Sequence, residues 1–305
     1  MWLWAAVVGE ASAGVWVRDA GDAYVQAGLS HAWADRMYLA GGRAVPQANP
    51  ALLGQLAPLF DRAAFSTTDL SAYGELGLGH GLELSAAVPL RYAERRWSFA
   101  SDWPDLRNHG VGLGDLAVGL RLGKVAGGWA GSGGLVARAP LYDNSPEALR
   151  VEAGNSDLAD DRVPLGQGTY ELEATAGGGR GFGKGWALVE AGLRARNRHF
   201  SLVVPGRVQV GVKPVAPVAA WVGADWAVSL GNGEAPDVFR DRWGKGPLVV
   251  DDQRSLAVSL GGSVEVAEGI SVLATGARTV AGSRYPVLTT LGLGVSVVRS
   301  VRRGP

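Results

Sequence analysis

The sequence predicts an all-β protein, a closed antiparallel transmembrane β-barrel of about 12 strands, from three observations. Long segments alternate strictly between apolar and polar residues, a period of two that strands show and helices do not. The segments run past ten residues, whereas strands of globular proteins average about five or six. The connections between them alternate between short and long, as in bacterial outer-membrane barrels.

The clearest alternation lies in residues 69–93, which form two arms around a turn. Leucine, alanine and valine occupy one face of both arms, and serine, glutamate and arginine occupy the other. The turn falls at His80, where the flanking Gly79 and Gly81 supply the positive φ angles that a tight turn needs. Strands of this length with one apolar face can cross a membrane.

The same pattern predicts the remaining strands in order. Besides the two arms, they are residues 22–34, 111–123, 129–141, 165–176, 187–196, 206–215, 218–230, 252–267, 270–280 and 286–298. Long polar connections are expected at 35–65, 95–108, 142–164 and 231–251, and a glycine-rich turn at 177–185. Within the first connection, residues 50–60 are apolar enough for one short helix, which could plug or gate the lumen or cap the rim.

Composition narrows the function classes. The 29 basic and 29 acidic residues balance, so there is no basic excess to indicate nucleic-acid binding. Cysteine is absent, which excludes disulfides, thiol nucleophiles and thiolate metal sites. Glycine, at 46 residues, is about twice as frequent as usual and lies within the alternating segments, where it suits a closed, curved sheet.

An even strand count and short turns at one end also predict the orientation. Both termini are expected in the periplasm, with the first and last strands paired to close the barrel. Closure matters because an open sheet edge in hydrocarbon leaves backbone groups unpaired. We therefore expect a monomer in the bacterial cell outer membrane, in contact with outer-membrane lipid and inserted by the barrel assembly machinery.

Residues 1–13 resemble the end of a secretory signal peptide. An apolar run is followed by Ala11-Ser12-Ala13, an A-x-A cleavage pattern, while the basic n-region is missing. We interpret this stretch as a truncated signal peptide, with residues 14–305 as a single outer-membrane barrel domain.

A soluble sandwich or lipocalin-like barrel would alternate equally well, but it would need a packed core. The small face is mostly Ala, Gly and Ser with charges along it, and the strands are long. Aromatic residues also gather near the strand ends, as in interfacial girdles: Trp33, Tyr92, Trp97, Trp103, Trp129, Tyr142, Tyr170, Trp186, Trp226 and Trp243.

The strand that begins Gly112-Leu113-Gly114-Asp115 resembles outer-membrane proteins of the meta-pathway phenol-degradation family. The stretches 14–24, 73–75, 88–90 and 164–166 are also similar to that family. The resemblance implies a barrel involved in the passage of aromatic or other apolar compounds. The C-terminus departs from many such barrels, because residues 298–305 do not end in an aromatic residue.

If the apolar face meets lipid, the other face lines the lumen. The lumen-lining candidates are Glu75, Glu83, Arg91, Asp115, Arg121, Arg138, Glu171, Glu173, Glu190, Arg194, Arg196, Arg207, Lys213, Asp225 and Glu265. They could form a selective polar conduit, or pair with one another in a plugged interior. Twelve strands lie between the filled eight-stranded and open sixteen-stranded cases, so both remain open.

No catalytic residue, metal site or cofactor is expected. His31, His80, His109 and His199 form no recognisable arrangement with a nucleophile, and their spacing is not that of metal ligands. The glycine-rich residues 177–184 lack the Lys-Ser/Thr ending of a phosphate loop. The sequence therefore favours a channel or transporter for small, apolar or aromatic molecules. The alternative is a non-conducting structural or adhesion barrel that acts through its outer loops.

Overall fold

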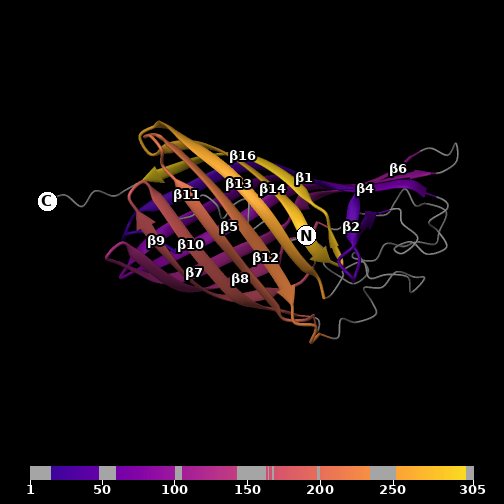
Figure 1. The fold of residues 1–305 in the computed structure, drawn as a ribbon, viewed down its shortest axis with the longest axis horizontal. Coiled ribbons are helices and arrows are strands. Elements are labelled where there is room, and N and C mark those ends of the chain that lie inside the picture. The colour runs from indigo at the N-terminus through magenta and orange to yellow at the C-terminus, as the bar shows by residue number, and fades with distance from the viewer. Residues whose placement is uncertain are drawn as a thin grey trace.

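The computed structural model describes residues 15–47, 60–99, 105–142, 163, 165–166, 168–197, 200–233 and 252–299. In these residues the chain forms the predicted all-β, closed antiparallel barrel of twelve staves. We call a stave one position in the barrel wall, filled by one strand or by two strands that continue each other. Figure 1 shows a single layer of tilted strands wrapped around a lumen. Within the described residues, no helix has the length and apolar character needed to cross a membrane.

The strands follow the chain in this order: β1 (Ala23–Ala34), β2 (Arg36–Tyr38), β3 (Ala44–Pro46), β4 (Phe60–Gly79), β5 (Leu82–Phe99), β6 (Leu106–Leu113), β7 (Asp115–Ala126), β8 (Trp129–Pro140), β9 (Glu171–Phe182), β10 (Gly185–Arg196), β11 (Val203–Val212), β12 (Val218–Ser229), β13 (Arg254–Ala267), β14 (Ile270–Ser283), β15 (Tyr285–Pro286) and β16 (Thr289–Arg299). Thirteen of them form the barrel sheet, in the order β4-β1-β16-β14-β13-β12-β11-β10-β9-β8-β7-β5-β6, and a β4–β5 pairing closes the ring. β15, β2 and β3 form a small separate sheet.

β6 and β7 together make one stave, because both pair with β5 and follow each other along it. The expected single strand at 111–123 is therefore interrupted, and Gly114 marks the break. Pro89 of β5 has no N–H to donate, and its carbonyl accepts a hydrogen bond from the Gly114 N–H at 2.9 Å. A Cβ at Gly114 would lie 2.7 Å from Cγ of Pro89, so only glycine fits opposite the proline ring.

Closure joins the first and last strands, as predicted. β1 is antiparallel to β16 from Ala23↔Arg299 to Trp33↔Thr289. Turns of two to five residues connect β4–β5, β7–β8, β9–β10, β11–β12 and β13–β14 at one end of the barrel, which we call the short-turn end. The predicted turn at His80 is among them and has positive φ at Gly79, His80 and Gly81. The opposite end is the long-loop end.

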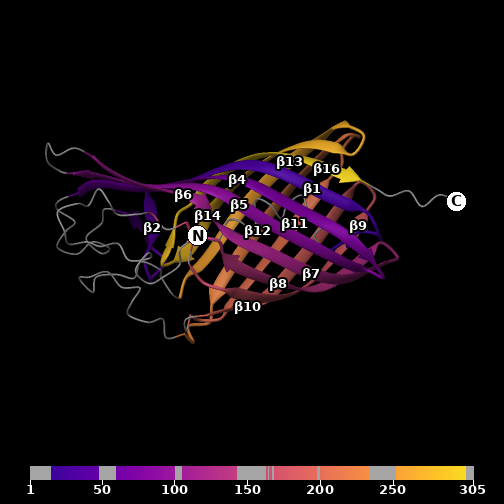
Figure 2. The same cartoon turned by 180° about the vertical axis from the view of Figure 1, so that it is seen from behind.

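β4 and β5 are much longer than the predicted arms, at 20 and 18 residues. They stay paired as far as Phe60↔Phe99, and β6 joins them through Trp97↔Leu106. Figures 1 and 2 show this three-stranded extension projecting beyond the long-loop end. The expected loop at 95–108 is therefore wrong for most of its length. Beyond the apolar belt the outer face becomes polar, and β4, β5 and β6 stay paired where the apolar outer face has stopped.

Two further boundaries differ from the expectation for a similar reason. The strand placed at 165–176 is β9, which begins at Glu171 and runs on to Phe182. The expected turn at 177–185 shrinks to Gly183 and Lys184, because the preceding glycines are paired strand residues. Glycine in a strand was mistaken for a sign of a turn. The predicted signal peptide at 1–13, the helix at 50–60 apart from Phe60, and His199 lie outside the described residues.

The two faces of the wall differ as expected for a lipid-facing barrel. Outward residues are apolar and exposed, such as Leu29, Leu70 and Leu90 at 53%, 55% and 46%. Inward residues are polar and buried, such as Glu83 at 1% and Arg194 at 3%. The apolar faces therefore cover the outside of the barrel rather than a packed core.

Three tryptophans each cover a glycine directly opposite on the next strand. The pairs are Trp186 with Gly211, Trp221 with Gly261 and Trp226 with Gly206, and a Cβ on any of these glycines would lie within 2.4 Å of the indole ring. Trp186, expected in an interfacial girdle, instead faces the lumen with Leu188 and packs beside Val15. Large aromatic rings cover strand glycines, which otherwise weaken a sheet.

Candidate functional site: the barrel lumen

Residues 15–22, which precede β1, lie against the inner wall of the barrel, and we call them the N-terminal segment. Val15 is fully buried and packs on Leu188 of β10. At the other end of the segment, Gly77 of β4 donates its N–H to the carbonyl of Asp22 at 2.9 Å. The segment thus contacts the wall at widely separated strands and occupies part of the lumen.

Inward-facing glycines make room for the N-terminal segment. A Cβ would lie 1.9 Å from the Asp19 carbonyl oxygen at Gly77, 2.9 Å from Val17 at Gly123, 2.8 Å from Val15 at Gly177 and 2.6 Å from Val15 at Gly179. Each distance is below the normal contact distance of two carbons. Several of the glycines on the polar face therefore form a docking track for this segment.

Arg18 is the polar anchor of the segment. Its Nε lies 2.6 Å from Oε2 of Glu75, and its backbone N–H donates to Oε2 of Glu83 at 3.0 Å. The Tyr73 hydroxyl donates to the other oxygen of Glu75 at 2.6 Å, and the guanidinium carbon lies 4.6 Å above the ring of Tyr24. Two carboxylates of the wall thus hold the segment in place.

Substituting Gly179 with valine is expected to expel the N-terminal end of this segment, because the new side chain would overlap Val15 and the ring of Trp16. The readout is labelling of a cysteine introduced at Val15, which is fully buried in the natural chain, by a membrane-impermeant thiol reagent. Labelling should rise strongly. The matched control is Gly181→Val, two residues along the same strand, where a Cβ meets nothing within 4 Å. Equal labelling in both variants would contradict the docking track.

Opposite charges face each other directly across neighbouring strands of the inner wall. The directly opposed pairs are Asp69 with Arg91, Glu83 with Arg121, Arg138 with Glu171, Glu173 with Arg194, Glu171 with Arg196, Glu190 with Arg207, and Arg207 with Asp225. We call this set the cross-strand charge series. It runs from β4 around to β12 and leaves most lumen charges beside a partner of opposite sign.

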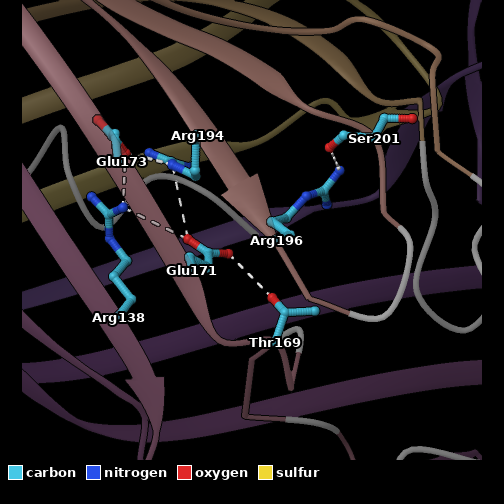
Figure 3. A network of polar contacts seen from close by, with 7 residues as sticks. All are labelled: Arg138, Thr169, Glu171, Glu173, Arg194, Arg196 and Ser201. Carbon is cyan, nitrogen blue, oxygen red and sulfur yellow. Dashed lines mark hydrogen bonds and ion pairs between the residues drawn. The ribbon is translucent and has the colours of Figure 1, made fainter.

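The densest part of this series is shown in Figure 3. Glu173 lies 2.5 Å from Nε of Arg194 and 2.8 Å from a terminal nitrogen of Arg138. Glu171 lies 3.6 Å from Arg138 and 3.8 Å from Arg194, so two arginines bracket two glutamates. Arg196 donates to the Ser201 carbonyl at 3.0 Å. Here the ion pairs brace the wall rather than leave charges open to a solute.

A second chain segment covers the inner wall toward the long-loop end. Arg91 binds Asp69 in a bidentate pair, with both distances 2.7 Å, and donates to the Leu165 carbonyl at 2.7 Å. Val163 and Leu165 are buried against Ala93 and its neighbours on the inner wall. Residues from the 142–164 connection and its end thus turn inward instead of extending away.

The motif residues quoted for the family resemblance meet at this place. A Cβ at Gly112 would lie 2.7 Å from a methyl carbon of Leu165, and one at Gly166 would lie 2.2 Å from the Tyr142 hydroxyl and 3.0 Å from Asp115. The Tyr142 hydroxyl accepts a hydrogen bond from the Gly168 N–H at 2.7 Å. The short glycine motifs therefore have a shared structural reason, which is close packing of the inward-turned segment.

A cavity of about 1110 Å³ lies at the short-turn end of the lumen. It is bounded by the N-terminal segment, the β4–β5 turn and the start of the β7–β8 hairpin. Arg18, Asp19, His80 and Lys124 are among its lining residues, together with several glycines. The lumen is therefore hollow on this side of the N-terminal segment.

The structure places thirteen of the fifteen lumen-lining candidates at inward positions on barrel strands. The other two lie at the short-turn end and are exposed. Lys213 follows the end of β11, and Glu265 accepts a hydrogen bond from the Gly269 N–H at the β13–β14 turn at 3.0 Å. Both sit where a strand runs into a turn, beyond the part of the wall that encloses the lumen.

Sequence reasoning missed Arg18, Asp69 and the inward-turned Leu165. Asp69 could have been found, because it lies an even number of residues from Glu75 in the first arm of the hairpin and therefore on the same face of the strand. Arg18 carried no such signal, since it precedes the first strand.

None of the three described histidines lies in the cross-strand charge series. His31 bonds the Thr68 hydroxyl at 2.9 Å and His109 stacks on Tyr92, both on the outer face, while His80 is in a turn. In the described ranges, no three His, Asp or Glu side chains are placed to hold a metal ion.

Comparison with known proteins gives a fold likeness alone. No family model matches the chain, and no curated protein matches its sequence. A crystal structure of an outer membrane channel from Pseudomonas putida F1 is similar, with a TM-score of 0.62 and 15% identity over 95% of this chain and 100% of that chain. The translocator domain of the autotransporter NalP from Neisseria meningitidis (TM-score 0.48, 14% identity, 96% and 92% covered) and the KdgM porin (0.43, 7%, 90% and 99%) are more distant. The chain thus shares the closed β-barrel fold of that protein.

Proposed function

We propose that this protein is an outer-membrane channel that passes small molecules, with apolar or aromatic compounds as its solute class. The observation that carries the proposal is how the lumen is filled. Instead of a core of interlocked wall side chains, a chain segment rests on glycines beside a cavity of about 1110 Å³. A segment held by a few polar contacts can leave, whereas a packed core cannot.

The solute class is inferred from the apolar patches of the lumen. Val15, Leu188 and Trp186 form one patch near the short-turn end, and Leu165 with Ala93 forms another toward the long-loop end. These patches flank the cross-strand charge series, whose charges are largely engaged with one another. With the N-terminal segment released, Leu188 and Trp186 would offer apolar surface to a solute beside little unpaired charge. The family resemblance of the glycine motifs supports the same class.

The proposal includes a location and partners. The exposed leucines and valines of the outer face require lipid around them, so we infer insertion in the bacterial outer membrane with the short-turn end in the periplasm. Every stave already has two neighbours, so a monomer closes without a partner subunit. Insertion by the barrel assembly machinery follows from that location. We propose no enzymatic role.

The alternative is a non-conducting structural or adhesion barrel. Two observations favour it: chain segments occupy the lumen, and the β4–β5–β6 extension projects from the long-loop end (Figure 2). The two proposals differ in whether the N-terminal segment ever leaves the wall.

A disulfide lock separates the two proposals. A Cβ at Gly123 would lie 2.9 Å from Cγ1 of Val17, so cysteines at these two positions come within bonding reach. The natural chain has no cysteine, so no other thiol competes. The measurement is flux, into proteoliposomes, of an aromatic glycoside that crosses lipid slowly, with a non-aromatic sugar of similar size as the comparison.

The oxidised double variant Val17→Cys/Gly123→Cys should block flux, and reduction should restore it. In the reduced state the aromatic solute should pass faster than the non-aromatic sugar. Reductant should leave the natural chain unchanged. Absence of flux in every state, including the reduced one, would favour the non-conducting barrel.

A further inference from the structure

The outer face of β1, β4, β5 and β6 changes character in steps toward the long-loop end. The last apolar row consists of Leu29, Leu70, Leu90 and Leu113, which are paired side by side and are 45–55% exposed. This row marks the upper edge of the lipid-facing belt on these strands.

The next two rows are rich in rings. They read His31, Thr68, Tyr92 and Val111, and then Trp33, Ser66, Glu94 and His109. His31 stacks on Trp33 with 5.6 Å between ring centroids, and Tyr92 stacks on His109 at 6.2 Å. Trp33 and Tyr92 remain 39% and 40% exposed. Aromatic rings at this level are typical of the membrane–water interface.

Arginines follow beyond the rings, on the same face of the extension. Arg96 and Arg107 are directly opposite each other on β5 and β6, and Arg62 lies one row further on β4. All three are exposed. Two like charges directly opposite one another destabilise a strand pair unless an anion lies between them. We call these residues, with Tyr92 and His109, the outer arginine surface.

The carboxylate nearest this surface pairs with Arg96 but leaves that arginine accessible. Glu94 is 8% exposed and accepts hydrogen bonds from both Arg96 and the Tyr92 hydroxyl. The bond from Arg96 holds the pKa of Glu94, which lies beyond the apolar belt, below its ordinary value. The side chain of Arg96 is still 54% exposed after making this pair. Two exposed carboxylates also lie nearby, Asp105 next to β6 and Asp61 next to Arg62, but Arg96 and Arg107 are the two like charges directly opposite each other.

We propose that the outer arginine surface binds the phosphorylated glycolipid of the outer leaflet. The order of the wall, apolar belt, then rings, then guanidinium groups, matches the order of acyl chains, sugar rings and phosphates in such a lipid. Sugar rings would lie on the stacked Tyr92 and His109, and a phosphate would bridge Arg96 and Arg107. Arginine suits this role because its planar fork binds phosphate through two hydrogen bonds.

The position of the arginines favours a glycolipid over a phospholipid. Six residues separate Leu90 from Arg96, about 20 Å along a strand and, at a tilt of about 35–45°, about 14–16 Å along the membrane normal. The headgroup layer of a phospholipid leaflet is only about 5–8 Å thick. A saccharide headgroup extends further from the hydrocarbon and can reach this surface. The inference goes beyond the channel proposal and rests on its outer-membrane location and orientation alone.

The test compares two variants that each lose two exposed cations. Arg96→Gln/Arg107→Gln removes the proposed phosphate site. The control, Arg180→Gln/Lys184→Gln, lies at the short-turn end, where Arg180 sits 4.9 Å above the ring of Trp129. Each purified barrel, in a neutral detergent, is titrated with bisphosphorylated lipid A, and the bound fraction is read by native mass spectrometry.

We expect the natural chain and the control to bind alike and the Arg96/Arg107 variant to bind about tenfold more weakly. Removing both phosphates from the probe should abolish this difference. The proposal would be overturned if all three proteins bound lipid A equally, or if the control lost as much affinity as the Arg96/Arg107 variant. It would also be overturned if the natural chain bound phosphatidylglycerol as tightly as lipid A.

Arg107→Gln alone leaves the Arg96–Glu94 pair intact, so it serves as the second variant if the double variant does not fold. It should weaken binding several-fold. Because binding is measured in micelles without transport, failure here leaves the channel proposal untouched, and absence of flux leaves this one untouched.

Discussion

Replacing Arg18 with alanine is expected to raise the ionic conductance of the barrel by releasing the N-terminal segment. The Arg18 guanidinium pairs with Glu75, with 2.6 Å between Nε and Oε2, and the Arg18 backbone N–H donates to Glu83. Without the guanidinium, the buried carboxylate of Glu75 would face a docked segment that carries no charge for it, while Glu83 keeps Arg121 at 3.7 Å. Loss of one partner of such a pair costs about 3 kcal/mol. That cost shifts the docking equilibrium about a hundredfold toward the released state.

The measurement is single-channel recording in planar bilayers, with open probability as the readout. Asp19→Ala is the matched control, because Asp19 is the exposed next residue of the segment and contacts Gly77 through its backbone oxygen. Arg18→Lys should lie between the control and alanine, since a single ammonium replaces the guanidinium fork. An open probability that is the same in Arg18→Ala and Asp19→Ala would rule out Arg18 as the anchor.

Replacing Glu173 with glutamine should destabilise the folded barrel more than the loss of any other charge discussed here. Glu173 is 7% exposed and contacts Arg194, which is 3% exposed, at 2.5 Å. The variant leaves that guanidinium buried near Arg138, with Glu171, 3.8 Å away, as its more distant remaining carboxylate. Removing one partner of a buried ion pair costs about 3–5 kcal/mol. The free energy of unfolding, measured by urea titration in lipid vesicles, should fall by that amount.

Glu190→Gln is the control for this change. Glu190 is also an inward glutamate opposite an arginine, Arg207, but the pair is 3.6 Å apart and the glutamate side chain is 23% exposed. Its loss should cost about 1 kcal/mol or less. If both variants unfold at the same urea concentration, burial of the Glu173 cluster does not stabilise the barrel.

The wall of the barrel was predictable because it obeys a local rule. Alternation of apolar and polar residues identified the staves, the turn at His80 and the closing pair of β1 with β16. The same rule failed where lipid no longer imposes an apolar face. The ends of β4 and β5 reach Phe60 and Phe99, yet residues such as Thr67 and Glu94 give no alternation there. Beyond the membrane, strand length depends on hydrogen bonding between neighbouring strands, which does not require apolar and polar residues to alternate in the sequence.

The contents of the lumen were not predictable, because they depend on contacts between distant residues. Val15 meets Gly177 and Gly179, and Leu165 meets Gly112, only once the barrel has closed. The sequence pattern places Gly77 and Gly123 on the polar face but does not reveal what fills the space that they leave. The charge partners were likewise only partly foreseen. The ion-pair partners of Arg138 are Glu171 and Glu173, because strand register decides which charges meet.

The cross-strand charge series has a consequence for assembly. If one strand slides by two residues, its apolar face still points to lipid, so the membrane cannot detect the error. The charges can: sliding β5 by two residues against β4 sets Asp69 opposite Pro89 or Ala93 instead of Arg91. Misaligned strands would bury unmatched charges at several kcal/mol each. The ion pairs thus favour the native register of neighbouring staves over registers shifted by two residues. The uniform lipid-facing surface cannot distinguish these registers.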